Sequence, residues 1–312
     1  MNIDLLKNEP RLLIEVSLRP IAGTRFQPTG FPDLGAATYK SADNADMLLV
    51  ESAQSMANRF EAAIWDTATD DLVAPLNGLP YVIATDAAGE SLTNSVLEAH
   101  RINSPYIYNA EGFAAIQTAV GYDEKRPFNS RKLAAALFKY DTNSLLHGIF
   151  LEKIGGVVRL PRVLSGFIEA TQVNVAASGG VKNDRVRAST DGEGKDASAG
   201  YGNVPFHRDE YTGLITAYFN LDLALIRGFG LGVPAENLLV SLALYKVQRF
   251  LRDGLRLRTA CDLDATDVKV TRPKAGLALP TITELEAALP GLIAASSPSF
   301  ASPAKTTLKY KG

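Results

Sequence analysis

Hydrophobic and polar positions alternate along residues 11–20, RLLIEVSLRP, and this period of two predicts a β-strand that ends at Pro20. Between residues 51 and 65 the apolar positions recur at helical spacing, while Ser52, Ser55 and Arg59 share a polar face. The run YVIATD, residues 81–86, predicts another strand. The first part of the chain is therefore expected to interleave strands with helices.

The middle of the chain predicts short helices followed by two strands. A helix is expected over 92–107, stopped near Pro105, and helical patches are expected at 131–140 and 144–154. Residues 166–175 and 213–226 have the β-branched and aromatic composition of strands.

Between these two strands the chain is rich in Gly, Ser, Asp and Lys and has almost nothing to pack. We interpret about 174–208 as a long mobile hairpin or arm that projects from a sheet. A disordered loop without a role is the alternative interpretation.

The last third predicts a long helix with a clear start and stop. Pro234 lies near its beginning, an apolar stripe follows, and Gly254 ends it. Basic residues recur every three positions at its end and are expected on one broad face: Lys246, Arg249 and Arg252.

A strand and a second helix are expected after that long helix. Alternation over 255–260 places Arg256 and Arg258 on one side of a strand. Thr281 and Glu284 have capping-box spacing and predict the start of a helix, which leads into a Ser/Pro/Lys tail. Strands interleaved with two main helices fit an α+β fold in which helices cover a sheet.

Composition limits the class of protein. With 312 residues the chain can bury a large core, and one cysteine, Cys261, excludes an internal disulfide framework and any site built from several thiolates. No apolar run approaches the roughly 20 residues that span a bilayer, and the N-terminus lacks a signal-like core. A cytoplasmic protein without membrane partners is expected.

The net charge of −2 hides segregation along the chain. Residues 41–100 hold ten acidic residues and one basic residue, whereas 125–187 hold eleven basic and four acidic residues, and 246–274 hold eight basic and four acidic residues. Such a chain could bind a polyanion on one surface and a second copy of itself through another. Alternatively, the segments intermix in space and their charges cancel.

No catalytic constellation is found. The three histidines, His100, His147 and His207, are not at ligand spacing from one another, and no zinc-protease, nucleophile-elbow or P-loop motif occurs. His147 has an apolar context typical of a core histidine, and His207 in PFHRDEY is more typical of a solvated strand edge than of acid–base chemistry. GFGLG has too few glycines for a dinucleotide fingerprint. We expect no enzyme activity, cofactor or resident metal.

Five segments of the first two-thirds of the chain share a resemblance, whereas the remainder matches in pattern only: GTRFQPTGFPDLGAA, LLVESAQSMANRFE, SVLEAHRINSPYI, DTNSLLHGIFLEK and RLPRVLSGFIEATQV. Together they resemble the backbone-forming RAMP subunit of the type I-G (formerly I-U) CRISPR effector complex, the "seven" subunit of Cascade. The resemblance implies an RRM-like (ferredoxin-like) core of order β-α-β-β-α-β with large insertions, in a single domain over 1–312. It also implies a helical insertion at about 66–160, a thumb-like β-hairpin at about 174–208 and a flexible tail at 295–312.

The resemblance implies an antiviral role in which many copies stack head to tail along one guide RNA (crRNA). The partners are then the crRNA, through it the target DNA, and the other Cascade subunits. The thumb of a neighbouring copy would displace a base at regular intervals. This arm lacks an obvious apolar wedge, so Val181, Val186 or Tyr201 would have to serve.

A subunit that accepts any spacer sequence must contact the RNA backbone and leave recognition to base pairing. Arginine forks and small hydroxyl or amide donors suit that task, and Phe26 or Phe31 could stack. The expected RNA-binding residues, some of which we expect to be ordinary surface cations, are Arg19, Arg25, Gln27, Thr29, Ser55, Arg59, His100, Arg101, Ser104, Arg159, Arg162, Ser165, Lys182 and Arg185.

Two alternatives stay open. Target-cleaving relatives in type III complexes carry a carboxylate in the loop after the first strand, and Asp33 in FPDLG has such a place, so a metal-dependent RNA endonuclease is possible. The same Asp33 could instead stabilise a structural turn by bonding local backbone N–H groups. The second alternative is a nucleotide- or metabolite-converting enzyme with a fortuitous basic surface.

Overall fold

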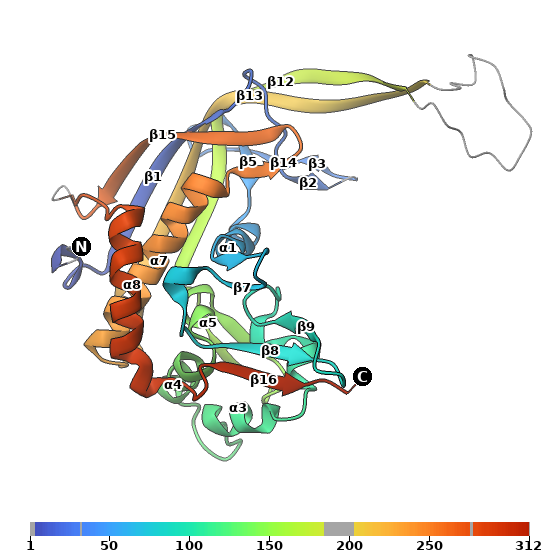
Figure 1. Ribbon diagram of the computed structural model, residues 1–312. Coiled ribbons are helices and arrows are strands. Elements are labelled where there is room, and N and C mark those ends of the chain that lie inside the picture. Colours follow the sequence, from blue (N-terminus) through green and yellow to red (C-terminus); the bar gives the residue numbers. More distant parts are fainter. Residues whose placement is uncertain (1–3, 32, 184–202, 275–276, 312) are drawn as a thin grey trace, which may run out of the picture.

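The computed structural model describes residues 4–31, 33–183, 203–274 and 277–311 (Figure 1). Its main element is a seven-stranded sheet of order β14-β15-β1-β13-β12-β5-β4, in which all neighbouring strands are antiparallel. The strands are β1 (Arg11–Pro20), β4 (Thr38–Lys40), β5 (Asp46–Glu51), β12 (Leu164–Asn183), β13 (Asn203–Asp222), β14 (Arg256–Arg258) and β15 (Cys261–Arg272).

Strand β1 confirms the prediction from alternation. Leu12, Ile14, Val16 and Leu18 are buried, and the residues between them are not. Because side chains of a strand point alternately to the two faces, the apolar set of β1 lies on the side that the helices cover. Strand β15 was not predicted, since only the first of its residues follow an apolar alternation.

Helices α1 (Ala53–Ala62) and α7 (Val233–Asp253) pack on this sheet. Three aromatic rings, one from each element, join these helices to β13. The ring centroid of Phe60 on α1 lies 5.9 Å from that of Phe219 on β13 and 5.6 Å from that of Phe250 on α7. Helix α8 (Ile282–Ser296) lies along α7 and begins with the predicted capping box of Thr281 and Glu284 (Figure 1). The predicted helices over 51–65 and 234–254 are confirmed, the first one somewhat shorter.

The end of α7 differs from the prediction that its basic residues share one broad face. Lys246 is fully buried, whereas Arg249 is partly buried and Arg252 is exposed. A spacing of three residues advances about 300° around a helix, so two successive steps shift the side chain from the buried face toward solvent.

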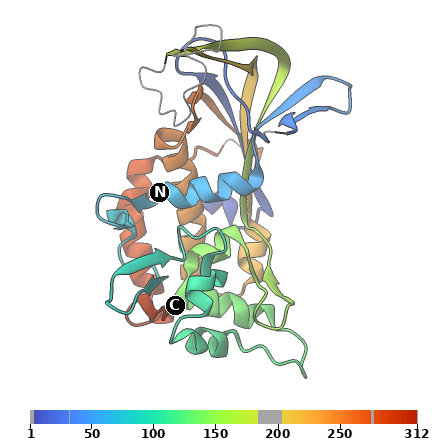
Figure 2. The same cartoon turned by 90° about the vertical axis from the view of Figure 1, so that its right-hand side faces the viewer.

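A lower part of the molecule, seen in both cartoon views, contains most of residues 65–160 (Figures 1 and 2). It holds strands as well as helices. They are β6 (Trp65–Asp66), β7 (Asp71–Leu72), β8 (Tyr81–Thr85), β9 (Ser91–Asn94), α2 (Pro105–Tyr108), α3 (Phe113–Val120), α4 (Ser130–Tyr140), α5 (Thr142–His147), β10 (Ile149–Leu151) and β11 (Val158–Leu160).

The predicted helix over 92–107 is wrong. Its first residues pair with β8 as β9, and Pro105 begins α2 instead of stopping a helix, because a proline at the first helical position needs no N–H partner. The helix predicted over 144–154 ends at His147, since Gly148 has a φ of +73° and turns the chain into β10. The patch at 131–140 is confirmed as α4.

The tail expected to be flexible also forms regular structure. Strand β16 (Lys305–Lys309) pairs in parallel with β8 and completes a three-stranded sheet of order β16-β8-β9. Leu308 is buried within it. The Ser/Pro/Lys composition concealed a strand that has its partner more than 200 residues away in the chain.

Strands β12 and β13 extend far beyond the remaining sheet (Figure 1). They pair from Leu164↔Leu221 out to Asn183↔Asn203, with an irregularity between Thr171 and Asn174. We call residues 174–183 and 203–212 the arm. The strand expected over 213–226 ends earlier, at Asp222, whose side chain caps α6 (Leu223–Gly228). Arg185, Val186 and Tyr201 lie outside the described residues.

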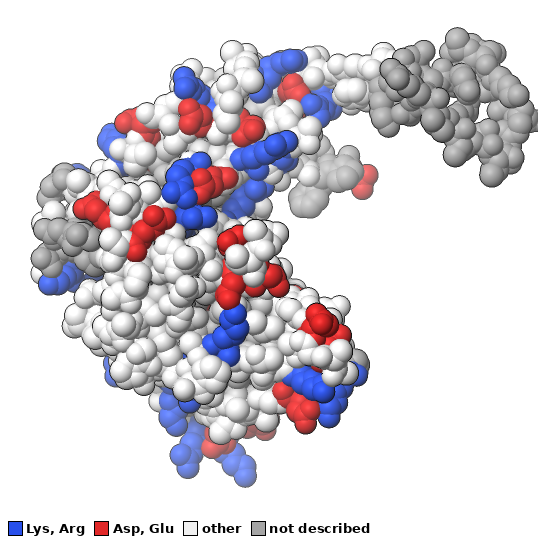
Figure 3. Space-filling view, in the orientation of Figure 1, with Lys and Arg blue, Asp and Glu red and all other residues white. Residues whose placement is uncertain are grey.

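Charged side chains of both signs lie next to one another over the upper sheet on the face shown in Figure 3. Ion pairs contribute to this mixing, such as Arg19 with Asp264 at 3.2 Å and Lys40 with Asp46 at 2.8 Å. Charges of both signs are therefore mixed on this part of the face. Within the part of the chain that the structure describes, no helix has both the length and the apolar character to cross a bilayer.

Candidate nucleic-acid interface

The loop after β1 is held by main-chain hydrogen bonds to three other parts of the sheet. Phe26 exchanges N–H···O bonds of 2.9 Å with Tyr211 in both directions, and Gln27 N–H donates to Ala260 O at 2.8 Å. Thr29 N–H donates to Val50 O at 3.1 Å. Phe26 is 1% exposed and anchors the loop in the core, so the expectation that Phe26 could stack on RNA is wrong.

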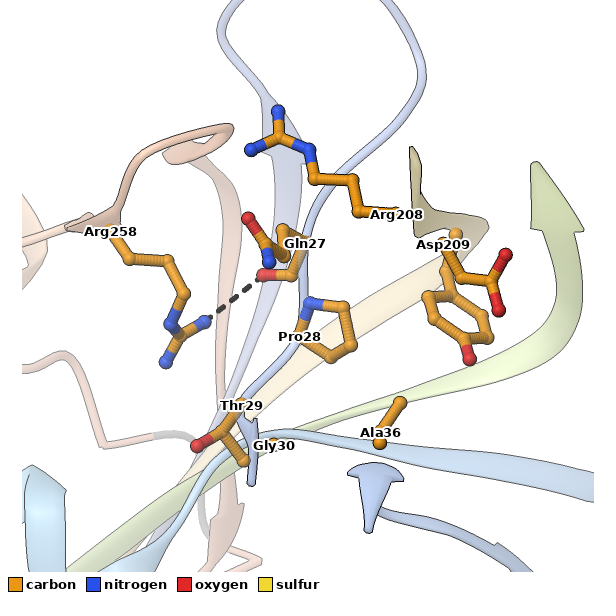
Figure 4. A pocket seen from close by; sticks show the side chains of 10 residues that line it. Gln27, Pro28, Thr29, Gly30, Ala36, Arg208, Asp209 and Arg258 are labelled. Atoms are coloured by element: carbon orange, nitrogen blue, oxygen red, sulfur yellow. Dashed lines mark hydrogen bonds between the residues drawn. The ribbon is translucent and has the colours of Figure 1, made fainter. Parts of the chain in front are cut away.

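This anchored loop forms one wall of an open hollow of about 520 Å³ (Figure 4). The opposite walls come from β13 and β14 and from the short hairpin of β2 (Gly30–Phe31) and β3 (Gly35–Ala36). The lining residues are Gln27, Pro28, Thr29, Gly30, Gly35, Ala36, Arg208, Asp209, Tyr211 and Arg258.

Two arginines that line the hollow are held in place by hydrogen bonds to other groups of the protein. Arg258 donates through Nη1 to Gln27 O at 3.1 Å and through Nη2 to the buried carboxylate of Glu51. Arg208 donates to Glu210 Oε1 through Nε at 3.1 Å and Nη2 at 2.7 Å. A guanidinium has five N–H donors, so each arginine keeps donors for a ligand.

The chemistry of this hollow suits a phosphate. Guanidinium forks match the paired oxygens of a phosphate, and Thr29 and Gln27 add hydroxyl and amide groups. Most hydrogen bonds of nucleic-acid complexes go to phosphate and sugar and are supplied by these same residue types. The hollow can therefore hold a strand by its backbone without reading its bases.

Two of the residues expected to bind RNA line this hollow. Gln27 and Thr29 were expected to bind RNA, and the structure brings them together here. Arg208 and Arg258 were missed as site residues, because they follow the loop by some 180 and 230 positions and only the pairing of the strands brings them near. The signal that could have found Arg258 is its alternation with Arg256 in LRLRTA.

Arg25 and Arg19 lie elsewhere on the same loop and strand. Arg25 lines a separate hollow of about 320 Å³ and lies 3.6 Å from Glu210. Arg19 pairs with Asp264 at the surface. Both side chains are exposed by more than half, so both remain accessible to a polyanion.

Three expected residues near α1 hold the fold together. Arg59 donates to Glu51 Oε2 at 3.0 Å and to Leu257 O at 2.7 Å, and Arg162 donates to Ala53 O at 2.6 Å. Ser55 is half-buried, and its N–H donates to the capping hydroxyl of Ser52. Among the described residues, no hydrogen bond or ion pair joins Arg25, Arg59 and Arg162 into one groove.

Arg101 and Ser104 are buried, and their expected contact with RNA is wrong. The guanidinium of Arg101 is bonded to the Glu61 carboxylate at 2.7 and 3.2 Å, and Ser104 caps α2. The expectation failed because the sequence alone does not distinguish a buried arginine such as Arg101, whose neighbour in the chain is exposed, from an arginine on the surface. His100 is exposed and lines a third hollow of about 380 Å³ with Tyr108, Phe150 and Lys153.

The remaining expected residues lie apart from the first hollow. Arg159 is exposed on β11, and Ser165 is half-buried on β12. Lys182 lies on the arm with only its backbone described, and Arg185 is outside the described residues. Val181 is 62% exposed on the arm.

The arm also carries an aromatic residue that the sequence analysis did not single out. Phe206 is 49% exposed, and its ring lies against Gly180, where an added Cβ would be 3.3 Å from the ring. Because glycine has no side chain, an aromatic ring on the neighbouring strand can pack directly against its backbone. Phe206 is thus a half-exposed ring that lies over the strand pair at Gly180.

Asp33, the residue of the nuclease alternative, is exposed in the turn between β2 and β3. Among the described residues, no group of three or more His, Cys, Asp and Glu side chains could hold a metal ion. His207 is 72% exposed beside Asp209 on the arm, in agreement with a solvated strand edge.

The family of the chain is recognised from its first half. Residues 12–175 match the model of a family described as "CRISPR-associated protein GSU0053". This match includes β1, the loop that lines the hollow, α1 and the start of the arm. No curated protein matches the chain.

Solved structures give weaker similarity. A chain from a structure described as "CRISPR RNA-guided surveillance complex, pre-nicking" has 12% identity and a TM-score of 0.42, with 86% of this chain and 80% of that chain covered. A chain of a second "CRISPR RNA-guided surveillance complex" has 12% identity and a TM-score of 0.40, with coverages of 86% and 72%. Csc2 of Thermofilum pendens has 11% identity and a TM-score of 0.30, with coverages of 96% and 84%.

These TM-scores are low, and the family match, which spans more than half of the chain and includes the wall of the hollow, is what assigns the protein. The chain belongs to the CRISPR-associated protein GSU0053 family.

Proposed function

We propose that this protein is a non-catalytic crRNA-binding backbone subunit of a Cascade effector complex of type I-G. The observation that carries the proposal is the hollow in which Gln27 and Thr29 meet Arg208 and Arg258 in a chain of this CRISPR-associated family. These donors line one hollow, and both arginines are already hydrogen-bonded within the protein: Arg258 to Gln27 O and Glu51, and Arg208 to Glu210.

The order of the elements supports an RRM-like core. Along the chain, β1, α1, β12, β13, α7 and β15 follow one another, and in the sheet β15, β1, β13 and β12 are neighbours in that order. This is the strand–helix–strand–strand–helix–strand succession that the resemblance implies. The arm would then be an extension of the hairpin formed by the second and third strands of this succession, β12 and β13.

The arm and the hollow suit assembly along a strand. Arg208 belongs to the arm and to the hollow, so an RNA gripped there would run past the base of the arm. In our proposal several copies bind one crRNA head to tail, and the arm of each copy contacts the strand beside its neighbour. Target DNA and the other Cascade subunits would join through the assembled crRNA.

Affinity for RNA tests the proposal. We expect Arg258→Ala and Arg208→Ala each to weaken binding about tenfold, and equally for two RNAs of unrelated sequence, because a phosphate contact carries no base information. The slope of log affinity against log salt should fall by about one for each substitution. Filter binding over a salt series measures both quantities.

Arg126→Ala is the matched control, since Arg126 is 82% exposed in the helical region and should change affinity little. A wild-type protein that purifies free of RNA and binds none would overturn the proposal. If all three variants lose the same affinity for RNA, the hollow has no specific role and binding depends only on the net charge of the protein.

A further inference from the structure

Glu51 is a buried carboxylate directly behind the hollow. It is 1% exposed at the end of β5, next to the strand residue that receives the Thr29 N–H. Its Oε2 accepts hydrogen bonds from Arg59 at 3.0 Å and from Arg258. One acidic group thus joins the hollow-lining Arg258 to a helix arginine that does not line the hollow.

The supports of Arg258 fix its orientation. Glu51 holds Nη2, and the carbonyl of Gln27 holds Nη1 at 3.1 Å, so the guanidinium is tied both to the end of β5 and to the anchored loop after β1. An arginine side chain that is free in solution pays entropy when it binds a ligand, whereas a fork already held in place pays less. Its remaining N–H groups are available at the wall of the hollow.

We propose that Glu51 is a positioning residue for RNA binding: its carboxylate fixes the Arg258 fork against the hollow and thereby raises the affinity for the RNA backbone. This inference rests on the proposed function and deepens it. Glu51 itself has no contact with the ligand, and its charge would repel a phosphate. Electrostatics alone and positioning therefore predict opposite signs for its removal.

The variants Glu51→Gln and Glu51→Asp separate the two effects. Removing a negative charge near a polyanion site should tighten binding if charge alone matters. If Glu51 positions Arg258, Glu51→Gln weakens RNA binding about tenfold although the protein becomes more positive. Glu51→Asp keeps the charge but is one methylene shorter, and it should weaken binding as well.

Two further variants make the test specific. Asp267→Asn removes an exposed carboxylate from β15, outside the hollow, and should bind RNA as tightly as wild type or slightly more tightly. In an Arg258→Ala background, Glu51→Gln should cause no further loss, because the group that it positions is gone. Merely structural damage would instead add to the loss.

The binding measurements are made on full-length protein at fixed salt, with the melting temperature of each variant recorded. Equal or tighter binding by both Glu51→Gln and Glu51→Asp would overturn the role of Glu51. If Glu51→Gln does not fold, Glu51→Asp alone decides, because the charge is unchanged in that variant. If wild type binds no RNA, or Arg258→Ala binds like wild type, the function proposed for the hollow fails instead.

Discussion

Buried charge in this protein is concentrated where α1, α5 and α7 meet. Lys246 Nζ contacts the side-chain oxygen of Asn143 and lies 2.7 Å from His147 Nε2, while Asn143 Nδ2 donates to Glu61 at 2.8 Å. Glu61 in turn binds Arg101. A buried cation is tolerated only when it is bonded and balanced, so this network connects the lower part of the molecule to the main core.

The pKa values of this network are displaced by burial. Desolvation lowers the pKa of Lys246 to about 7, and burial and the neighbouring cations Lys246 and Arg101 hold the pKa of His147 well below its usual 6.5. Burial raises the pKa of Asp141 to about 6. His147 was expected to be a core histidine, and its position confirms this.

His147 predicts a loss of stability in mild acid. Its pKa is depressed in the folded state, so the folded protein stays unprotonated at His147 while the unfolded chain binds a proton below pH 6.5. Relative to His147→Gln, the wild type should lose up to about 1.4 kcal/mol of unfolding free energy per pH unit below 6.5. Urea denaturation of both proteins between pH 7.5 and 5.5 measures this difference. A constant difference over that range would contradict the pKa assignment.

At the scale of elements, the arm combines a long backbone pairing with few apolar contacts. Its residues pair strand to strand out to Asn183↔Asn203, while Val175, Val181 and Phe206 remain exposed. These exposed apolar side chains are available for contact with another molecule. This fits the proposed contact with RNA beside a neighbouring copy.

Phe206 is the exposed phenyl ring among the described side chains of the arm, and we propose it as a stacking residue. We expect Phe206→Ala to weaken RNA binding about tenfold, since stacking of a base on an aromatic ring contributes about 1–3 kcal/mol. Phe206→Tyr keeps the ring and should retain affinity. The melting temperature should barely change in either variant, because the ring is half exposed. Affinity that is unaltered in Phe206→Ala would exclude this residue as a stacking platform.

The elements that sequence could predict are those specified by local pattern. Alternation in β1, the apolar stripe of α7 and the capping box of α8 each lie within a short window. The elements that were missed depend on distant partners: β9 pairs with β8, and β16 becomes a strand only beside it. Strand propensity does not predict such pairings, because they depend on contacts with distant parts of the chain.

The same distinction holds for the candidate site. The loop with Gln27 and Thr29 was predicted as a candidate because its prolines and polar residues are contiguous. Arg101 and Arg59 looked identical to surface cations, and only their carboxylate partners, Glu61 and Glu51, identify them as structural. Sequence shows which residues are charged, whereas burial decides which charges remain available.

At the scale of the whole molecule, the proposed head-to-tail assembly must use charges that are not already paired. Part of the acidic excess of residues 41–100 is neutralised within the protein, because Glu51 and Glu61 are buried in ion pairs. Glu90 and Asp70 remain exposed: Glu90 lies in the turn between β8 and β9 of the three-stranded sheet, and Asp70 directly precedes β7. Exposed carboxylates of this kind would face a basic surface of the next copy.

Charge reversal there should shorten the assembly on RNA. We expect the double variant Asp70→Asn, Glu90→Lys to bind fewer copies per long RNA than wild type, as measured by mass photometry at low salt. The asparagine tolerates the positive φ of residue 70, which is +49°. The control Asp267→Asn, Glu124→Lys changes the charge equally at exposed positions elsewhere and should leave the copy number unchanged. If both double variants assemble like wild type, this face is not the contact.

The parallel pairing of β16 with β8 has a consequence for synthesis of the protein. Tyr81 pairs with Lys305, so the small sheet cannot close until residues 305–309 have left the ribosome. Nascent chains acquire their domains from the N-terminus onward, and pairings of such wide separation form slowly. Until then, β8 has an unprotected edge that could bind a foreign strand. Emergence of residues 305–309 is thus the event that lets β16 cover this edge of β8.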